Sequence, residues 1–103
     1  MTTGISIPAI KTAILSIRTD ASSDVEHLYG FGSFFRGEAK FNDVDLVAVF
    51  VDANDLVNRF YRFRDLLAPI ETEYGIDFDI TPLTPSEFAG RPLCDMETLV
   101  LIW

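Results

Sequence analysis

A β-branched, apolar run that opens with two acids constrains this chain more than any other feature. Asp43 and Asp45 alternate with Val44 and Leu46, and the apolar run then continues to Val51. Such a run predicts a strand buried in a sheet, with charge confined to its first residues. Acids at positions i and i+2 of a strand project from the same face, so the two carboxylates repel each other. We therefore expect a proton or a cation to relieve this repulsion.

Helical and strand patterns alternate along the rest of the chain. Apolar spacings of three and four predict helices over 7–17 and 56–74, and Ser6 is the candidate N-cap of the first helix. A short helical piece is expected after Ser33, and the capping box from Thr84 to Glu87 predicts another short helix. Pro69 is expected to kink or split the long helix. Strands are predicted over 25–31, 43–51, 76–83 and 98–103. The length fits a single domain, 1–103, and the alternation predicts an α/β (α+β) layered fold.

Composition limits the classes of function. Sixteen acidic and eight basic residues give a formal net charge of −8. A surface this negative repels phosphate backbones, so direct nucleic-acid binding is not expected, although a divalent metal can invert the field locally. The N-terminus has no signal pattern, and the apolar run 99–103 is too short to span a bilayer. We expect a cytoplasmic protein without a membrane segment.

Two surface features have open interpretations. Arg59, Arg62 and Arg64 of the long predicted helix are expected to form a solvated face, with docking of a partner as the alternative. The last predicted strand ends at Trp103, which could serve an interface if it is exposed.

A second motif, Gly32-Ser33, follows the predicted strand 25–31. Glycine lets a ligand approach the backbone closely, and the N–H groups at a helix start can hold phosphate oxygens. Alone, a Gly-Ser pair is common, and an Asp-x-Asp is more often a solvated strand end. Together they describe a site for a metal-bound nucleoside triphosphate, with Mg²⁺ favoured because its ligands are oxygens and substrate phosphates.

The combined pattern resembles a known family. The sequence is similar to the nucleotidyltransferase superfamily related to DNA polymerase β in one pattern. This pattern is an apolar residue, Gly and Ser, nine intervening residues, and then Asp–apolar–Asp–apolar. Arg36-Gly37 and the chain length narrow the resemblance to the minimal nucleotidyltransferases, the MNT group. It implies the nucleotidyltransferase fold, a mixed sheet of about four strands with helices packed against it. Asn42 replaces the family's usual Ser. Phe34-Phe35 replace residues that are often small or polar, and could pack on a base, a partner or the core.

The resemblance also implies roles for individual residues. Asp43, Asp45 and a third carboxylate would hold two Mg²⁺ ions during AMP transfer from ATP to an acceptor hydroxyl. Asp79 fits the family pattern better than Asp77, which stays open as the alternative.

The phosphates have their own expected ligands. Gly32 and Ser33 would bind the β- and γ-phosphates. Arg36 either contacts a phosphate or lies on the surface.

A protein partner is a further implication of the resemblance. The family commonly pairs with a small helical protein of the HEPN type in a toxin–antitoxin module, where the nucleotidyltransferase is the antitoxin and modifies a toxin tyrosine. The alternative is a catalytically weak or inactive protein of the same fold that neutralises its partner by binding, and a homodimer is also open. A ferredoxin-like regulatory domain fits the predicted order of elements poorly.

Overall fold

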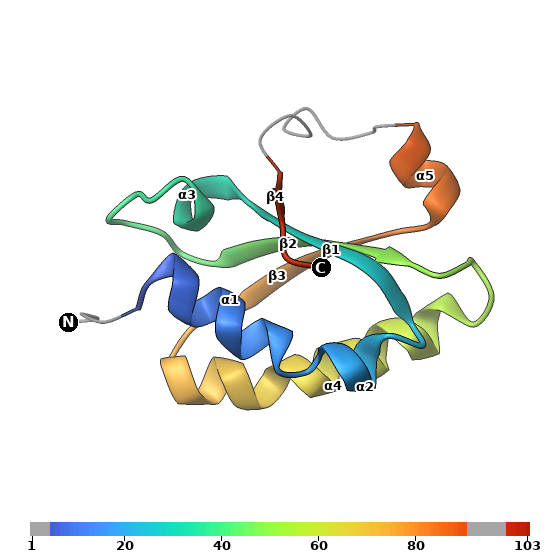
Figure 1. Cartoon of the computed structure of the whole chain (residues 1–103), viewed down its shortest axis with the longest axis horizontal. Coiled ribbons are helices and arrows are strands. Elements are labelled where there is room, and N and C mark those ends of the chain that lie inside the picture. Colours follow the sequence, from blue (N-terminus) through green and yellow to red (C-terminus); the bar gives the residue numbers. More distant parts are fainter. Residues whose placement is uncertain (1–4, 91–98) are drawn as a thin grey trace.

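The computed structural model describes residues 5–90 and 99–103, and its elements follow the predicted alternation with one additional short helix (Figure 1). The helices are α1 (Ile7–Leu15), α2 (Arg18–Ala21), α3 (Gly32–Phe35), α4 (Leu56–Tyr74) and α5 (Pro85–Ala89). The strands are β1 (Val25–Phe31), β2 (Val44–Phe50), β3 (Phe78–Leu83) and β4 (Val100–Leu101). The predicted final strand is therefore shorter than expected, and its first residue, Thr98, lies outside the described residues.

The strands form one mixed sheet in the order β3-β2-β1-β4. β2 and β3 are parallel, whereas β1 is antiparallel to both β2 and β4. Helices α1, α2 and α4 cover one face, and α5 lies on the other side (Figure 1). This is the mixed α/β layered fold predicted from the sequence.

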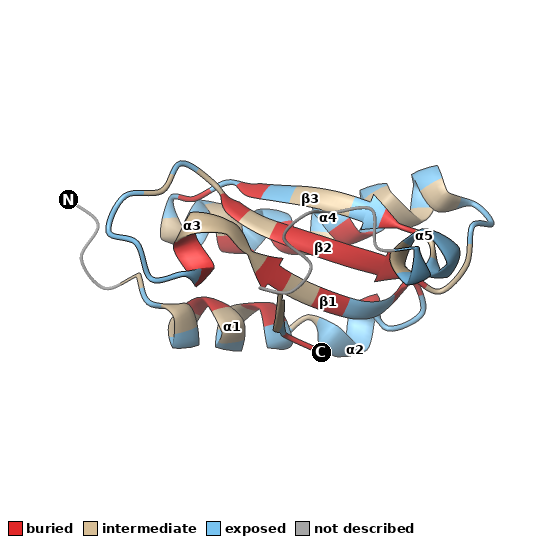
Figure 2. Cartoon of the chain, turned by 90° about the horizontal axis from the view of Figure 1, so that it is seen from above, coloured by how far each residue is buried: buried red, intermediate tan, exposed pale blue. Residues whose placement is uncertain are grey.

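β2 is buried on both faces, as its composition predicts. Val44, Leu46 and Phe50 belong to the large core under the helices, while Val47 and Val49 belong to a smaller apolar cluster on the opposite face. The smaller cluster is completed by Leu83, Tyr29, Phe31, Phe88 and Leu99. On this face Val47 and Val49 are buried, whereas β3 carries exposed and partly buried residues, as the colours in Figure 2 show.

Local signals at the helix ends are confirmed. Ser6 caps α1 by accepting a hydrogen bond from the Ala9 N–H, and Thr84 and Glu87 form the predicted capping box of α5. The expected split at Pro69 is wrong, because α4 runs through it to Tyr74. Pro69 is exposed, so water can reach the backbone groups that the proline leaves without a helical partner. Among the described residues, no helix combines the length and apolar character needed to cross a membrane.

The C-terminal tryptophan is part of the core and does not form an exposed interface. Trp103 is 6% exposed, and its ring packs edge-on against Phe63 of α4. Its indole Nε1 donates to the carbonyl of Val25 at 3.4 Å. Beyond β4, the Trp103 carbonyl accepts from the Leu28 N–H, so the chain end is held against β1.

Two of the three helix arginines bind a buried acid, so the expected solvated face is only partly correct. Asp24, 4% exposed, precedes β1 and accepts hydrogen bonds from Arg59 Nη1 at 2.8 Å and from Arg62 Nη2 at 2.8 Å. The hydrogen bond from Arg62 is the largest influence that lowers the pKa of Asp24 below its ordinary value of 3.8. Asp24 therefore joins the start of β1 to α4 through charged hydrogen bonds.

Replacing Asp24 by Asn should lower the free energy of unfolding at neutral pH by about 1–3 kcal/mol, since two guanidinium groups lose their carboxylate. The matched control is Asp52→Asn. Asp52 is half exposed and lies 3.9 Å from Arg59, so its replacement should cost less than about 0.5 kcal/mol. Urea denaturation of the three proteins measures both effects.

The sign of the pH dependence follows from the lowered pKa of Asp24. Its contribution is fully present above 3.8, the ordinary value of the unfolded chain, and is lost as pH falls through the lower folded-state pKa. The stability gap between wild type and Asp24→Asn should therefore close below that pH. A gap that stays constant under acid would contradict this account.

Candidate nucleotide and metal site

Two acids lie side by side on neighbouring strands. The parallel register of β2 and β3 pairs Asp45 with Asp79 and Val47 with Thr81. Side chains alternate along a strand, so Asp45 shares a face with Val47 and Val49, whose cluster lies opposite α1 and α4. Figure 2 looks onto this face, with β1, β2 and β3 side by side in front of α4. Asp45 and Asp79 therefore occupy the face opposite α1 and α4, near the start of both strands.

The glycine of the Gly-Ser motif lies against one of these carboxylates. β1 is paired with β2 so that Phe31 stands opposite Asp45, and the chain then turns into α3 at Gly32. Gly32 has a φ of 77°, and a Cβ added there would collide with Asp45 Oδ2 and lie 3.1 Å from its Cγ. Glycine is required at this position for its backbone angle and for its lack of a side chain.

The acids predicted from the sequence influence one another through their charges. Burial is the first cause of the raised pKa of Asp45, and the charges of Asp79 and then Asp43 raise it further, while Arg36 opposes them. Asp43, Asp45 and Asp79 are thus brought close enough to repel. Within residues 5–90 and 99–103, however, no group of three or more Asp, Glu, His or Cys side chains is arranged so that it could hold a metal ion.

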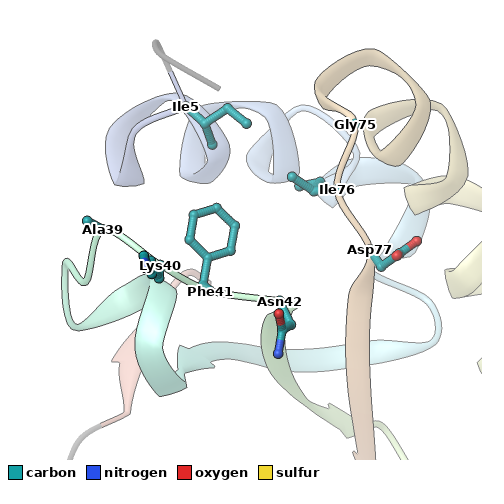
Figure 3. A pocket seen from close by; sticks show the side chains of 8 residues that line it. All are labelled: Ile5, Ala39, Lys40, Phe41, Asn42, Gly75, Ile76 and Asp77. Carbon is teal, nitrogen blue, oxygen red and sulfur yellow. The ribbon is translucent and has the colours of Figure 1, made fainter. Parts of the chain in front are cut away.

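Asp77, the alternative third acid, lies in different surroundings. It precedes β3 and lines a cleft of about 420 Å³ together with Ile5, Phe41 and Ile76. Figure 3 shows its carboxylate turned away from Asn42, the residue before Asp43. The charges that raise the pKa of Asp45 come from Asp79 and Asp43. The geometry therefore favours Asp79 over Asp77 as the neighbour of the pair.

The remaining motif residues surround the turn. Ser33 is half-buried in α3, and its carbonyl accepts from the Glu38 N–H at 3.1 Å. The exposed Arg36 donates through Nε to Glu38 Oε2 at 2.8 Å, and its charge still favours ionised Asp45. Phe34 and Phe35 are buried, 4% and 7% exposed, which decides among their three expected surroundings in favour of the core.

Two solved structures have a fold similar to that of this chain. A crystal structure of a toxin–antitoxin with AMP-PNP superposes with a TM-score of 0.58 at 18% identity, covering 90% of this chain and 72% of that chain. A protein from Sulfolobus solfataricus assigned as a nucleotidyltransferase superposes with a TM-score of 0.56 at 22% identity, covering 98% of this chain and 91% of that chain. The chain has a nucleotidyltransferase-like fold. No family model and no curated protein matches its sequence.

One structural residue of this nucleotidyltransferase-like fold escapes the sequence analysis. A Cβ added to Gly30 of β1 would collide with Phe35 Cε2 and Cζ and lie 2.6 Å from Cδ2. The absent side chain therefore makes room for the ring that seats α3 on the sheet. The available signal was a glycine inside a strand, which often marks a close approach.

Gly32→Ala and Gly37→Ala form a matched pair of variants. Both positions have positive φ, 77° and 82°, so each substitution should cost about 1–2 kcal/mol of stability. Nothing lies within 4 Å of a Cβ at Gly37, so only Gly32→Ala should displace the Asp45 carboxylate.

The measurement is an NMR titration of Asp45 in both variants. Gly37→Ala should leave the pKa of Asp45 raised, whereas Gly32→Ala should return it toward its ordinary value as the carboxylate leaves its half-buried position. The same pKa in both variants would show that the approach of Gly32 does not hold this carboxylate.

Proposed function

We propose that this protein is a Mg²⁺-dependent nucleotidyltransferase that transfers AMP from ATP to a hydroxyl group of a protein partner. The observation that carries the proposal is the pairing of Asp45 with Asp79 beside the Gly32 turn. The nucleotidyltransferase-like fold supports it, because two structures of similar fold are a toxin–antitoxin with AMP-PNP and a protein assigned as a nucleotidyltransferase.

The donor set fits Mg²⁺. Asp43, Asp45 and Asp79 offer only carboxylate oxygens, and the pKa of Asp45, raised by burial and then by the charges of Asp79 and Asp43, shows a carboxylate that a cation would stabilise. Because the described acids do not form a ready three-ligand cluster, phosphate oxygens and water would complete the ligand set. When bound, Mg²⁺ stabilises negative charge on the attacking and leaving oxygens.

The chain's own groups would orient the reaction. The acceptor oxygen forms a bond to the α-phosphorus, the bond from that phosphorus to its bridging oxygen breaks, and pyrophosphate leaves with the electron pair. A carboxylate takes the acceptor's proton, and Asp79 is best placed because it is the exposed member of the in-register pair.

Gly32, Ser33 and Arg36 would bind the β- and γ-phosphates. Backbone N–H groups in the first turn of a helix have no helical partner and can face a phosphate, and the guanidinium of Arg36, close enough to influence Asp45, would add positive charge. The influence of Arg36 on Asp45 supports this placement.

A protein acceptor is the substrate class that we favour. The fold similarity to a toxin–antitoxin structure and the charge of −8 both suit a basic protein partner, for which a helical HEPN-type protein is the candidate. The lack of a ready three-ligand cluster among the described residues favours one alternative, a protein that neutralises its partner by binding with weak or no catalysis.

Addition of Mg²⁺ with ATP should raise the melting temperature, because a ligand that binds only the folded protein stabilises it. At about one hundred times the dissociation constant the gain should be about 2.7 kcal/mol. Asp45→Asn and Asp79→Asn should abolish the shift. Asp77→Asn is the matched control from the same segment and should retain it. An unchanged melting temperature in millimolar Mg-ATP, or a shift that depends on Asp77 and not on Asp79, would refute the assignment.

Transfer itself is tested by mass spectrometry of the partner. The protein, Mg-ATP and the product of its neighbouring gene are incubated together, and the partner should gain the mass of one or more AMP groups. Asp43→Ala should remove this gain because it removes a ligand of the site. Complex formation without a mass gain, unaffected by Asp43→Ala, would instead support neutralisation by binding.

A further inference from the structure

Three aromatic side chains enclose the loop that joins the Gly-Ser motif to the acids. Phe34 and Phe35 lie in α3, and Phe41 lies two residues before Asp43. The ring centroids of Phe34 and Phe35 are 5.2 Å apart, and those of Phe34 and Phe41 are 4.9 Å apart, both edge to face. The contact between Phe34 and Phe41 therefore joins the two ends of the loop.

Phe35 fixes this aromatic group to the sheet. Its ring fills the space that a side chain at Gly30 would need, so the close approach of α3 to β1 depends on this glycine. Phe34 and Phe35 both belong to the large core under the helices, and Phe41 packs against that core as a partly buried residue. One end of the loop is thus held firmly, and the other end is held through Phe41.

Phe41 is the least enclosed of the three rings. It lines two clefts, one of about 420 Å³ with Asn42 and Asp77 and one of about 310 Å³ with Phe34 and Gly37. Figure 3 shows its ring rising from the loop toward Ile5. The contact of Phe41 with Phe34, together with the Val44 N–H that donates to the Asp77 carbonyl at 2.9 Å, restrains the end of the loop that enters Asp43.

We propose that Phe34 and Phe41 are positioning residues, whose contact holds Asp43, the residue before β2, near the Gly32-Ser33 turn, while the pairing of β1 with β2 places Asp45. This inference rests on the proposed function, in which the turn binds phosphates and the acids bind Mg²⁺. A triphosphate must meet both groups at once, so a loop that is already closed spares the ligand the cost of ordering it. Neither ring needs to touch the nucleotide.

The test compares Mg-ATP affinities of three variants by isothermal titration calorimetry. Phe41→Leu removes the ring contact but keeps an apolar side chain, and it should weaken binding about tenfold or more. Phe63→Leu is the matched control, because Phe63 is fully buried on α4 and contacts Phe50 and Trp103. It should be destabilised yet bind Mg-ATP within about twofold of wild type. Phe41→Trp keeps an aromatic ring, for which the adjoining clefts offer room, and should retain affinity.

Each titration is run at a temperature at which circular dichroism shows that variant to be folded. Wild-type affinity in Phe41→Leu, equal weakening in Phe41→Leu and Phe63→Leu, or a loss in Phe41→Trp as large as that in Phe41→Leu would each overturn the positioning role. The wild-type titration separates the two proposals. If the wild-type protein does not bind Mg-ATP, both the proposed function and this inference are refuted. If the wild-type protein binds Mg-ATP and the Phe41 variants bind it equally well, only this inference is refuted.

Discussion

The parallel register between β2 and β3 is the constraint on which the candidate site depends. On the helix face, this register seats Val44, Leu46 and Phe78 in the large core. On the opposite face, the same register forces Asp45 next to Asp79. A slip of one residue would move Phe78 out of the core and an acid into it, at a cost far greater than the repulsion between two partly solvated carboxylates. The apolar core therefore holds the two charges together.

The antiparallel pairing of β1 with β2 adds the second half of the site. It places Phe31 opposite Asp45, so the next residue, Gly32, begins its turn beside that carboxylate. The direction of α3 is then set by Phe35, whose ring needs the empty position at Gly30. Gly32, through its backbone angle, and Gly30, through its lack of a side chain, thus position the short helix α3 against the acids.

The parts of this arrangement that the sequence predicts are those encoded locally. β2, α4, the cap at Ser6 and the capping box of α5 follow from periodicity and from neighbouring residues, and the structure confirms them. Asp77 and Asp79 could not be separated by alternation, since residues two apart share a face; the start of β3 after Asp77 separates them. The burial of Trp103 and the pairing of Asp24 with α4 depend on contacts 35 or more residues away, which no local pattern contains.

The two aspartates with shifted pKa values, Asp24 and Asp45, differ in their charged neighbours. Asp24 receives Arg59 and Arg62, whose hydrogen bonds and charges lower its pKa. The pKa of Asp45 is raised first by burial and then by the charges of Asp79 and Asp43. Above the ordinary aspartate value the stabilisation by Asp24 is therefore fully present, whereas Asp45 lowers the stability as pH rises toward its raised folded-state pKa. Within residues 5–90 and 99–103, Arg36 is the cation that lowers the pKa of Asp45, against burial and two acids that raise it. A half-buried carboxylate beside an exposed acid, next to a glycine turn with positive φ, is the pattern expected where a cation and an anionic ligand bind together.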